Sequence, residues 1–199
     1  MRPIDATANA FTDALASVRS ASIRPDFVIE EGPAPQRLAP HAVAITAEMA
    51  DLDDDRASGR FVLLHDPDGV DEWDGTFRAV VFARAELEHD VATDPMLQEV
   101  AWTWLVDAMT GAGAVGTHVG GTITVTSGAS FGSMSDRPAE SFVEIRASWT
   151  PLEIDGLSVP ETMDRHVHAW IDVMAQAAGL TPMPTGIAHV GSVRRRTRA

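Results

Sequence analysis

The segment Asp94–Thr110 constrains the fold more than any other stretch, because it has the pattern of a helix that is apolar on two sides. Thr93 can serve as its N-cap, and Gly111 stands where a helix commonly ends. One apolar face has the spacing of a helix packed on a core and consists of Leu97, Val100, Ala101, Trp104, Leu105 and Ala108.

A second apolar face, made by Trp102, Val106 and Met109, is expected on the other side of this helix. At about 100° per residue, Trp102 lies roughly 160° from Trp104, so the two indoles cannot share a face. A helix that is apolar on two sides is normally buried on two sides. The second face should therefore meet either a flanking helix or another copy of the chain. The second alternative predicts a homodimer.

Helical and strand-like segments alternate along the chain in the order α-β-β-β-β-α-β-β-α. Helices are expected at 6–20, 94–110 and 158–178, and strands at 27–31, 41–49, 60–65, 76–86, 114–126 and 143–149. Consecutive strands favour a mainly antiparallel sheet of five to six strands with helices packed on it, an α+β fold. We expect one such domain over residues 1–180 and a flexible tail over residues 181–199.

The charge balance limits the classes of partner. The 199 residues carry 29 acidic groups against 15 arginines and no lysine, a formal charge of −14, which argues against nucleic-acid backbone binding. The exception is the basic run Arg194–Arg198, which can contact RNA or fold back on the chain's own acidic surface. No apolar run reaches the ~18–20 residues that span a bilayer, so we expect a cytoplasmic protein without a membrane partner.

Few residues suggest catalysis or a cofactor. The absence of cysteine excludes disulfides, thiolate catalysis and cysteine-ligated metal centres. There is no G-x-G-x-x-G motif, no P-loop and no hydrolase signature, so no cofactor is predicted and an enzyme is disfavoured.

An acidic stretch between two expected strands offers a metal-dependent alternative. Carboxylate oxygens from such a loop can bind Ca²⁺ or Mg²⁺. The candidate ligands are His65, Asp66, Asp68, Asp71 and Glu72. The EF-hand pattern fails because Val70 occupies a ligand position, and Asp-Pro-Asp-Gly is also common in turns, so a solvated hairpin loop is the other interpretation.

Two further residues are candidates for contact with a partner. Trp73 lies in a polar stretch, where a tryptophan can anchor a partner or fold under its own hairpin. Arg37, held between prolines, can present its guanidinium to a carboxylate or phosphate, or form an internal salt bridge.

Four stretches together resemble a family of unknown function, DUF3000, from actinobacteria. They are Pro33–Pro40, Ser58–Gly69, Trp73–Arg78 and Glu144–Pro151, and the resemblance covers roughly residues 8–180. The resemblance implies a cytoplasmic actinobacterial protein and carries over no catalytic residue. It draws attention, as candidate ligand-binding or partner-binding residues, to Arg37, His65, Asp66, Trp73 and Arg78.

In topology alone, the expected element order is similar to the type III secretion chaperone and YbjN-like fold. Members of that group are small, acidic, usually dimeric and non-enzymatic, which would make the Trp102 face a dimer interface. The leading hypothesis is therefore a non-enzymatic acidic binding module or chaperone-like adaptor that acts as a homodimer on a protein partner. The alternative is a metal-dependent enzyme or metal-binding protein that uses the stretch 65–74.

Overall fold

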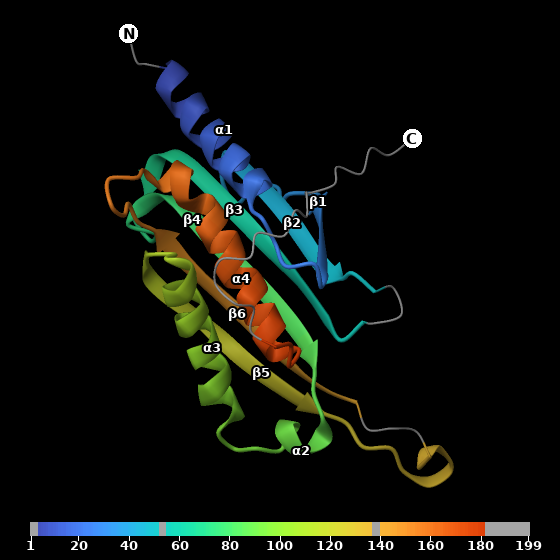
Figure 1. The fold of residues 1–199 in the computed structure, drawn as a ribbon. Coiled ribbons are helices and arrows are strands. Elements are labelled where there is room, and N and C mark those ends of the chain that lie inside the picture. Colours follow the sequence, from blue (N-terminus) through green and yellow to red (C-terminus); the bar gives the residue numbers. More distant parts are fainter. Residues whose placement is uncertain (1–3, 52–54, 137–139, 182–199) are drawn as a thin grey trace, which may run out of the picture.

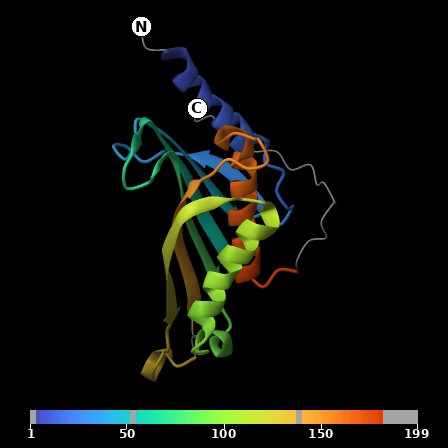
Figure 2. The ribbon, with the colours of Figure 1, turned by 90° about the vertical axis from the view of Figure 1, so that its left-hand side faces the viewer.

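The fold is a single six-stranded antiparallel sheet with its helices on one side (Figures 1 and 2). The computed structural model describes residues 4–51, 55–136 and 140–181, with side chains from residue 10 onward. The spatial order of the strands is β1-β2-β3-β4-β6-β5. Their bounds are β1 Phe27–Gly32, β2 His41–Met49, β3 Ala57–Val70, β4 Gly75–Glu86, β5 Gly116–Ser127 and β6 Ser141–Pro151.

Three helices cover one face of the sheet. They are α1 (Ile4–Ser20), α3 (Leu97–Ala112) and α4 (Met163–Ala177), and α4 lies between the other two (Figure 1). The predicted order of elements and the α+β class are confirmed; a short helix α2 (His89–Ala92) is additional. None of the helices in the described ranges is long and apolar enough to cross a membrane. The tail expected beyond residue 181 lies outside those ranges, so the domain boundary stays a prediction.

The core forms where the inward residues of the central strands meet α4. Ile45, Phe61 and Val81 are cross-strand neighbours in one row, and each is at most 2% exposed. Trp170 of α4 packs on this row and donates a 3.0 Å hydrogen bond from Nε1 to the backbone oxygen of Phe82. At Gly59 a Cβ atom would stand 2.6 Å from the Met174 sulfur, so a glycine is needed for α4 to approach the sheet closely.

A capping box formed by Ser158 and Glu161 precedes α4. Ser158 accepts from the third residue of the turn, and the Glu161 carboxylate accepts from the Ser158 backbone N–H at 2.9 Å. With Pro160 in this first turn, the chain forms the 3-10 helix η2 (Val159–Thr162) before α4 begins at Met163.

The predicted ends of α3 are wrong at both sides. Asp94, rather than Thr93, accepts the Met96 backbone N–H at 2.8 Å, and the helix begins only at Leu97. At the other end Gly111 is helical, and Gly113 ends the helix with a φ of 66°. The left-handed conformation that closes a helix is available to either glycine, so sequence pattern alone did not distinguish them.

The long loop predicted between β3 and β4 is also wrong. β3 continues past His65 to Val70 and pairs there with Gly75, which leaves a four-residue turn over residues 71–74. The pairing is irregular between His65 and Val70, where Gly69 has a φ of 80°. This bulge lets a segment rich in turn-forming residues remain paired as a strand.

Candidate functional site

The sheet face opposite the helices is open, and its centre is apolar. Side chains alternate along β3 and β4, so buried residues such as Val81 face the helices. Val62, Val80 and Phe82 therefore face the open side of the sheet. These three side chains are half-buried, and Val62 and Val80 are direct cross-strand neighbours. The centre of the open face is therefore an apolar strip that solvent reaches.

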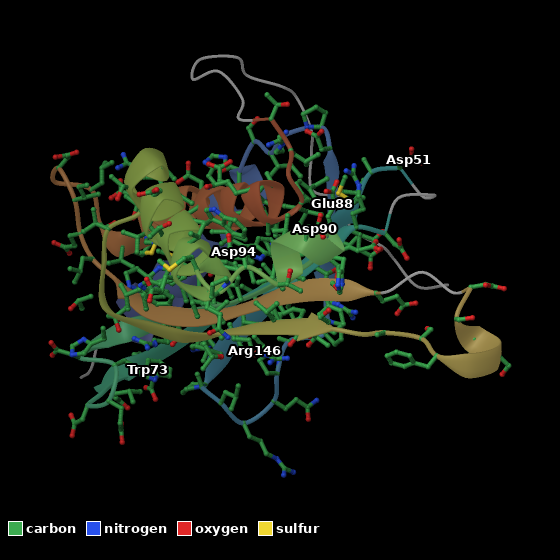
Figure 3. The ribbon with its side chains drawn as sticks, turned by 90° about the horizontal axis from the view of Figure 1, so that it is seen from below. Asp51, Trp73, Glu88, Asp90, Asp94 and Arg146 are labelled. Carbon is green, nitrogen blue, oxygen red and sulfur yellow. The ribbon has the colours of Figure 1, made fainter. Side chains whose placement is uncertain are left out.

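Four arginines surround this apolar strip. Arg60 on β3 and Arg146 on β6 are the cross-strand partners of Phe82 on its two sides. The Cζ atom of Arg146 lies 5.2 Å from the Phe82 ring centroid, within the range of a cation–π contact. Figure 3 shows Arg146 on the side of the sheet away from the helices. Arg84 lies on the same face, with its Cζ atom 3.9 Å from the Phe142 ring centroid.

Most of this positive charge has no acidic partner. Arg146 pairs with Glu144 at 2.7 Å, but its side chain remains 56% exposed. Arg60 donates instead to the backbone oxygen of Pro33, at the start of the β1–β2 connection. Within the described ranges, neither Arg60, Arg78 nor Arg84 forms a salt bridge with a carboxylate. An anionic group can therefore approach these three arginines without displacing a carboxylate of the described residues.

Arg78, to which the family resemblance drew attention, is held in place by three hydrogen bonds. Its guanidinium donates to Thr150 Oγ1 at 3.0 Å, to Ser148 Oγ at 2.7 Å and to the His118 backbone oxygen at 3.2 Å. Burial lowers the pKa of Arg78, because its charged form is partly removed from water. Thr150 Oγ1 in turn donates to the Trp73 backbone oxygen at 2.5 Å. The arginine thus connects β4, β5, β6 and the β3–β4 turn.

A bulge in β5 shapes one side of the open face. The register of β5 against β6 shifts between Thr117 and Gly120, so the pair Gly120-Gly121 accompanies a bulge and not a tight turn. A Cβ atom on Gly121 would overlap the backbone oxygen of Arg146. The resulting depression has a volume of about 330 Å³ and is lined by Arg60, Val62, Val80–Phe82, Gly120–Thr122 and Arg146–Ser148.

The five residues suggested by the family resemblance do not form one site. Trp73 is half-buried in the β3–β4 turn (Figure 3) and is joined to Arg78 through Thr150. Arg37 is exposed in the β1–β2 connection with a φ of 71°. His65 is on the helix side of the sheet and only 2% exposed. Asp66 accepts the Asp68 backbone N–H at 3.0 Å, which is turn chemistry.

The carboxylates of the stretch 65–74 do not converge on a common point. Strand alternation sends His65 and Asp66 to opposite faces, and Asp71 and Glu72 lie in the turn. Throughout the described ranges there is no group of three or more His, Asp or Glu side chains that could hold a metal ion. Metal dependence stays an untested alternative, without a preformed site to support it.

The second apolar face of α3 is largely covered by the chain itself. Met109 is 7% exposed, Trp102 is half-buried against the core, and only Val106 is exposed, at 45%. Gln98 donates to the Ile123 backbone oxygen at 3.5 Å, so the side of α3 that carries Trp102 one turn later faces β5.

Trp104, on the opposite flank of α3, lines a cavity together with Ala177 and Ala178 at the end of α4. Trp102 and Trp104 therefore have different neighbours. The elements beside them belong to the same chain: β5 on the Trp102 side, and α4 on the Trp104 side. Met109 is buried within the chain, and the dimer interface predicted at Trp102, Val106 and Met109 stays a prediction.

The sequence pattern missed Arg60 and Arg146, although it showed Arg78, Val80, Phe82 and Arg84 alternating along β4. The alternating pattern could be read from β4 alone. The positions of Arg60 and Arg146 beside Phe82 could not, because they depend on how β3 and β6 pair with β4. The basic run Arg194–Arg198 lies outside the described residues.

Comparison with known proteins gives one match. No curated protein and no solved structure matches the chain. The family described as "Protein of unknown function (DUF3000)" matches residues 7–188, which is most of the sequence. These residues include all six strands and the four arginines of the open face. The chain therefore belongs to the DUF3000 family.

Proposed function

We propose that this chain is a non-enzymatic binding module whose open sheet face binds an acidic segment of a partner protein. The observation that carries the proposal is Phe82, half-buried between Arg60 and Arg146, with three of the four arginines free of carboxylate partners among the described residues. On a chain of formal charge −14, such a face is complementary to acidic rather than basic partners.

The chemistry of the face suits a segment that is both acidic and apolar. A guanidinium can bind a carboxylate through two parallel hydrogen bonds, which favours Asp and Glu side chains beside Arg60 and Arg146. Val62, Val80 and Phe82 offer the apolar contact between them. A depression of about 330 Å³ is too shallow to enclose a large ligand, and it suits side chains presented by an extended or helical segment.

A binding titration tests this proposal. The probe is a labelled peptide of alternating Glu and Val residues, with a counterpart in which Lys replaces Glu. We expect the Glu peptide to bind the intact chain and the Lys peptide not to bind. In the double variant Arg60→Gln/Arg146→Gln, affinity should fall about tenfold or more, since each charge-assisted hydrogen bond contributes ~1.5–3 kcal/mol.

The matched control is Arg19→Gln. Arg19 lies on α1 and pairs with Glu31 at 2.8 Å, so this variant removes a positive charge away from the open face. Equal loss of affinity in the control and in the double variant, or no binding of the Glu peptide at all, would overturn the proposal.

The wider proposal is a chaperone-like adaptor that acts as a homodimer in the actinobacterial cytoplasm. It is supported by the acidic composition and by exposed apolar residues on α3, Val100 at 41% and Val106 at 45%. Multi-angle light scattering at micromolar concentration tests the dimer, and Val106→Asp should dissociate it. A monomer in the parent protein would rule out self-association. A dimer that dissociates in Arg146→Gln would instead place a second copy on the open face.

A further inference from the structure

Strand β5 forms one edge of the sheet, and its outer side is open. Among the described residues its only strand neighbour is β6, and β1 forms the opposite edge. Figure 2 shows the β5 edge, in yellow, toward the viewer, with α3 beside it on the helix side. An edge strand presents a row of backbone N–H and C=O groups that can pair with a further strand.

The two edges of the sheet differ in their protection against such pairing. Strand β5 has 12 residues and contains no Asp, Glu, Arg, Lys or Pro. Strand β1 has 6 residues, carries Glu30 and Glu31, and is followed by Pro33. Charged side chains, prolines and short length all keep an edge strand from pairing with another chain. Edge β1 therefore resists the addition of a strand, and edge β5 lacks these features.

The register of β5 determines which of its backbone groups point outward. Just past the end of β5, the Gly128 N–H donates to the Glu140 backbone oxygen at 2.8 Å. Backbone direction alternates in an antiparallel ladder, so the even-numbered residues that follow the bulge point toward β6. Gln98 of α3 reaches the Ile123 oxygen at 3.5 Å, which agrees with an outward direction for odd-numbered residues. The outward set is Gly121, Ile123, Val125 and Ser127.

This outward set is symmetric about Thr124, so it can pair with itself. With a two-fold axis at Thr124, Ile123 faces Val125 of the second copy, and Gly121 faces Ser127 of the second copy. On a chain of formal charge −14 two copies repel each other, and an uncharged edge reduces that repulsion. The side chains that meet on the open face are exposed threonines, Thr122, Thr124 and Thr126.

The same symmetry covers an exposed apolar side chain of α3. Gln98, Trp102 and Val106 are four residues apart, so they share the flank of α3 that faces β5. Val106 is 45% exposed on this flank. Of the three long helices, α3 lies nearest the β5 edge (Figure 1). A two-fold axis at Thr124 therefore brings the Val106 flanks of the two α3 helices toward each other.

We infer that β5 pairs antiparallel with β5 of a second copy, so that one sheet continues through both chains. The inference rests on the homodimer of the proposed function and assigns its interface. It is separate from the binding of an acidic partner, which the Arg60→Gln/Arg146→Gln titration tests independently. Because the β1 edge is short and charged, association stops at two copies.

Two variants at the axis test the pairing. Thr124 is exposed, so Thr124→Lys and Thr124→Glu should both fold, and each places two equal charges opposite one another in the dimer. By multi-angle light scattering, at a concentration where the parent is a dimer, each variant alone should be a monomer. An equimolar mixture should recover the dimer, because lysine then faces glutamate.

The matched control is Val28→Lys. Val28 is 43% exposed on the other edge strand, so this variant makes the same charge change away from β5 and should stay dimeric. A monomeric parent would overturn both this inference and the proposed homodimer. A parent dimer that persists in both Thr124 variants, or an equal loss of the dimer in Val28→Lys, would overturn the β5 pairing alone.

Amide hydrogen exchange gives a second measurement that does not depend on the variants' mass. In the parent dimer the outward amides of Ile123 and Val125 should be protected, and in Thr124→Lys they should exchange quickly. The amides of Thr122 and Thr126 should stay protected in both proteins, because they pair with β6, which shows that the variant is folded. Fast exchange of Ile123 and Val125 in a parent dimer would overturn the inference.

Discussion

The indole N–H of Trp149 donates a 2.9 Å hydrogen bond to Nδ1 of His166, and both side chains are fully buried. Because Nδ1 accepts this bond, the neutral imidazole must carry its proton on Nε2. Among the described residues, Nε2 has no hydrogen-bond partner. Burial, and secondly the charge of Arg165, lower the pKa of His166 to about 4, so the ring stays neutral in the folded protein at pH 7.

This pair predicts that stability falls in mild acid. Between the unfolded value of 6.5 and the folded pKa of about 4, the unfolded chain binds a proton at His166 and the folded chain does not. The contribution is fully present above pH 6.5 and is lost as the pH falls toward 4. A shift of this size corresponds to roughly 3 kcal/mol of unfolding free energy.

Urea unfolding at pH 7, 5.5 and 4 measures this loss, with His166→Gln as the comparison. A glutamine oxygen can still accept the Trp149 N–H but does not titrate in this range. Asp172, whose pKa burial raises, titrates in both proteins, so the difference between the two isolates His166. The same pH dependence in both proteins would show that His166 does not carry it.

Substitution by alanine should have very different effects on stability at the neighbouring glycines Gly120 and Gly121 of β5. A Cβ atom at Gly121 would overlap the Arg146 backbone oxygen and stand 2.9 Å from Ala147 Cα, whereas at Gly120 it would meet nothing within 4 Å. We expect Gly121→Ala to lower the free energy of unfolding by about 1–3 kcal/mol, because β5 must move away from β6. Gly120→Ala is the control and should be close to neutral; equal urea midpoints for the two variants would contradict the register described here.

Alanine substitutions at the two glycines near the end of α3 should change the free energy of unfolding in opposite directions. Gly111 is helical with open space around its Cβ position, so Gly111→Ala should raise the free energy of unfolding by about 0.5–1 kcal/mol. Gly113 has a φ of 66°, and alanine there should cost about 1–2 kcal/mol. Thermal unfolding of both variants checks this. Stabilisation by Gly113→Ala would mean that the helix ends at Gly111, as its sequence pattern suggested.

Periodicity predicted the elements well where one face of a strand or helix is buried. The alternation of Val143, Ile145, Ala147 and Trp149 located β6, and the Ser158–Glu161 capping box lies at the 3-10 helix η2, one turn before α4 begins. The strand β3 was cut short because Asp-Pro-Asp-Gly favours turns locally, while pairing with β4 across a bulge extends it. Local preference was overridden there by sheet pairing.

The candidate site was less predictable, because it depends on strand register. Phe82 is flanked by Arg60 and Arg146 only because β3 and β6 both pair with β4, and these three strands are distant in sequence. Equally, the spacing of Trp102 and Trp104 fixed their directions but not their neighbours. The elements beside the two indoles, β5 and α4, follow α3 in the chain, and no helical periodicity identifies them.

We propose that the open sheet face is where an acidic partner binds. Arginine side-chain NMR resonances report on it directly, because each Nε–H group can be followed during titration with the Glu–Val peptide. The Arg60, Arg78 and Arg146 signals should shift, while those of Arg19 and Arg24, which pair with Glu31 and Asp26, should remain in place. Shifts confined to Arg19 and Arg24, or equal shifts at all five, would contradict the claim.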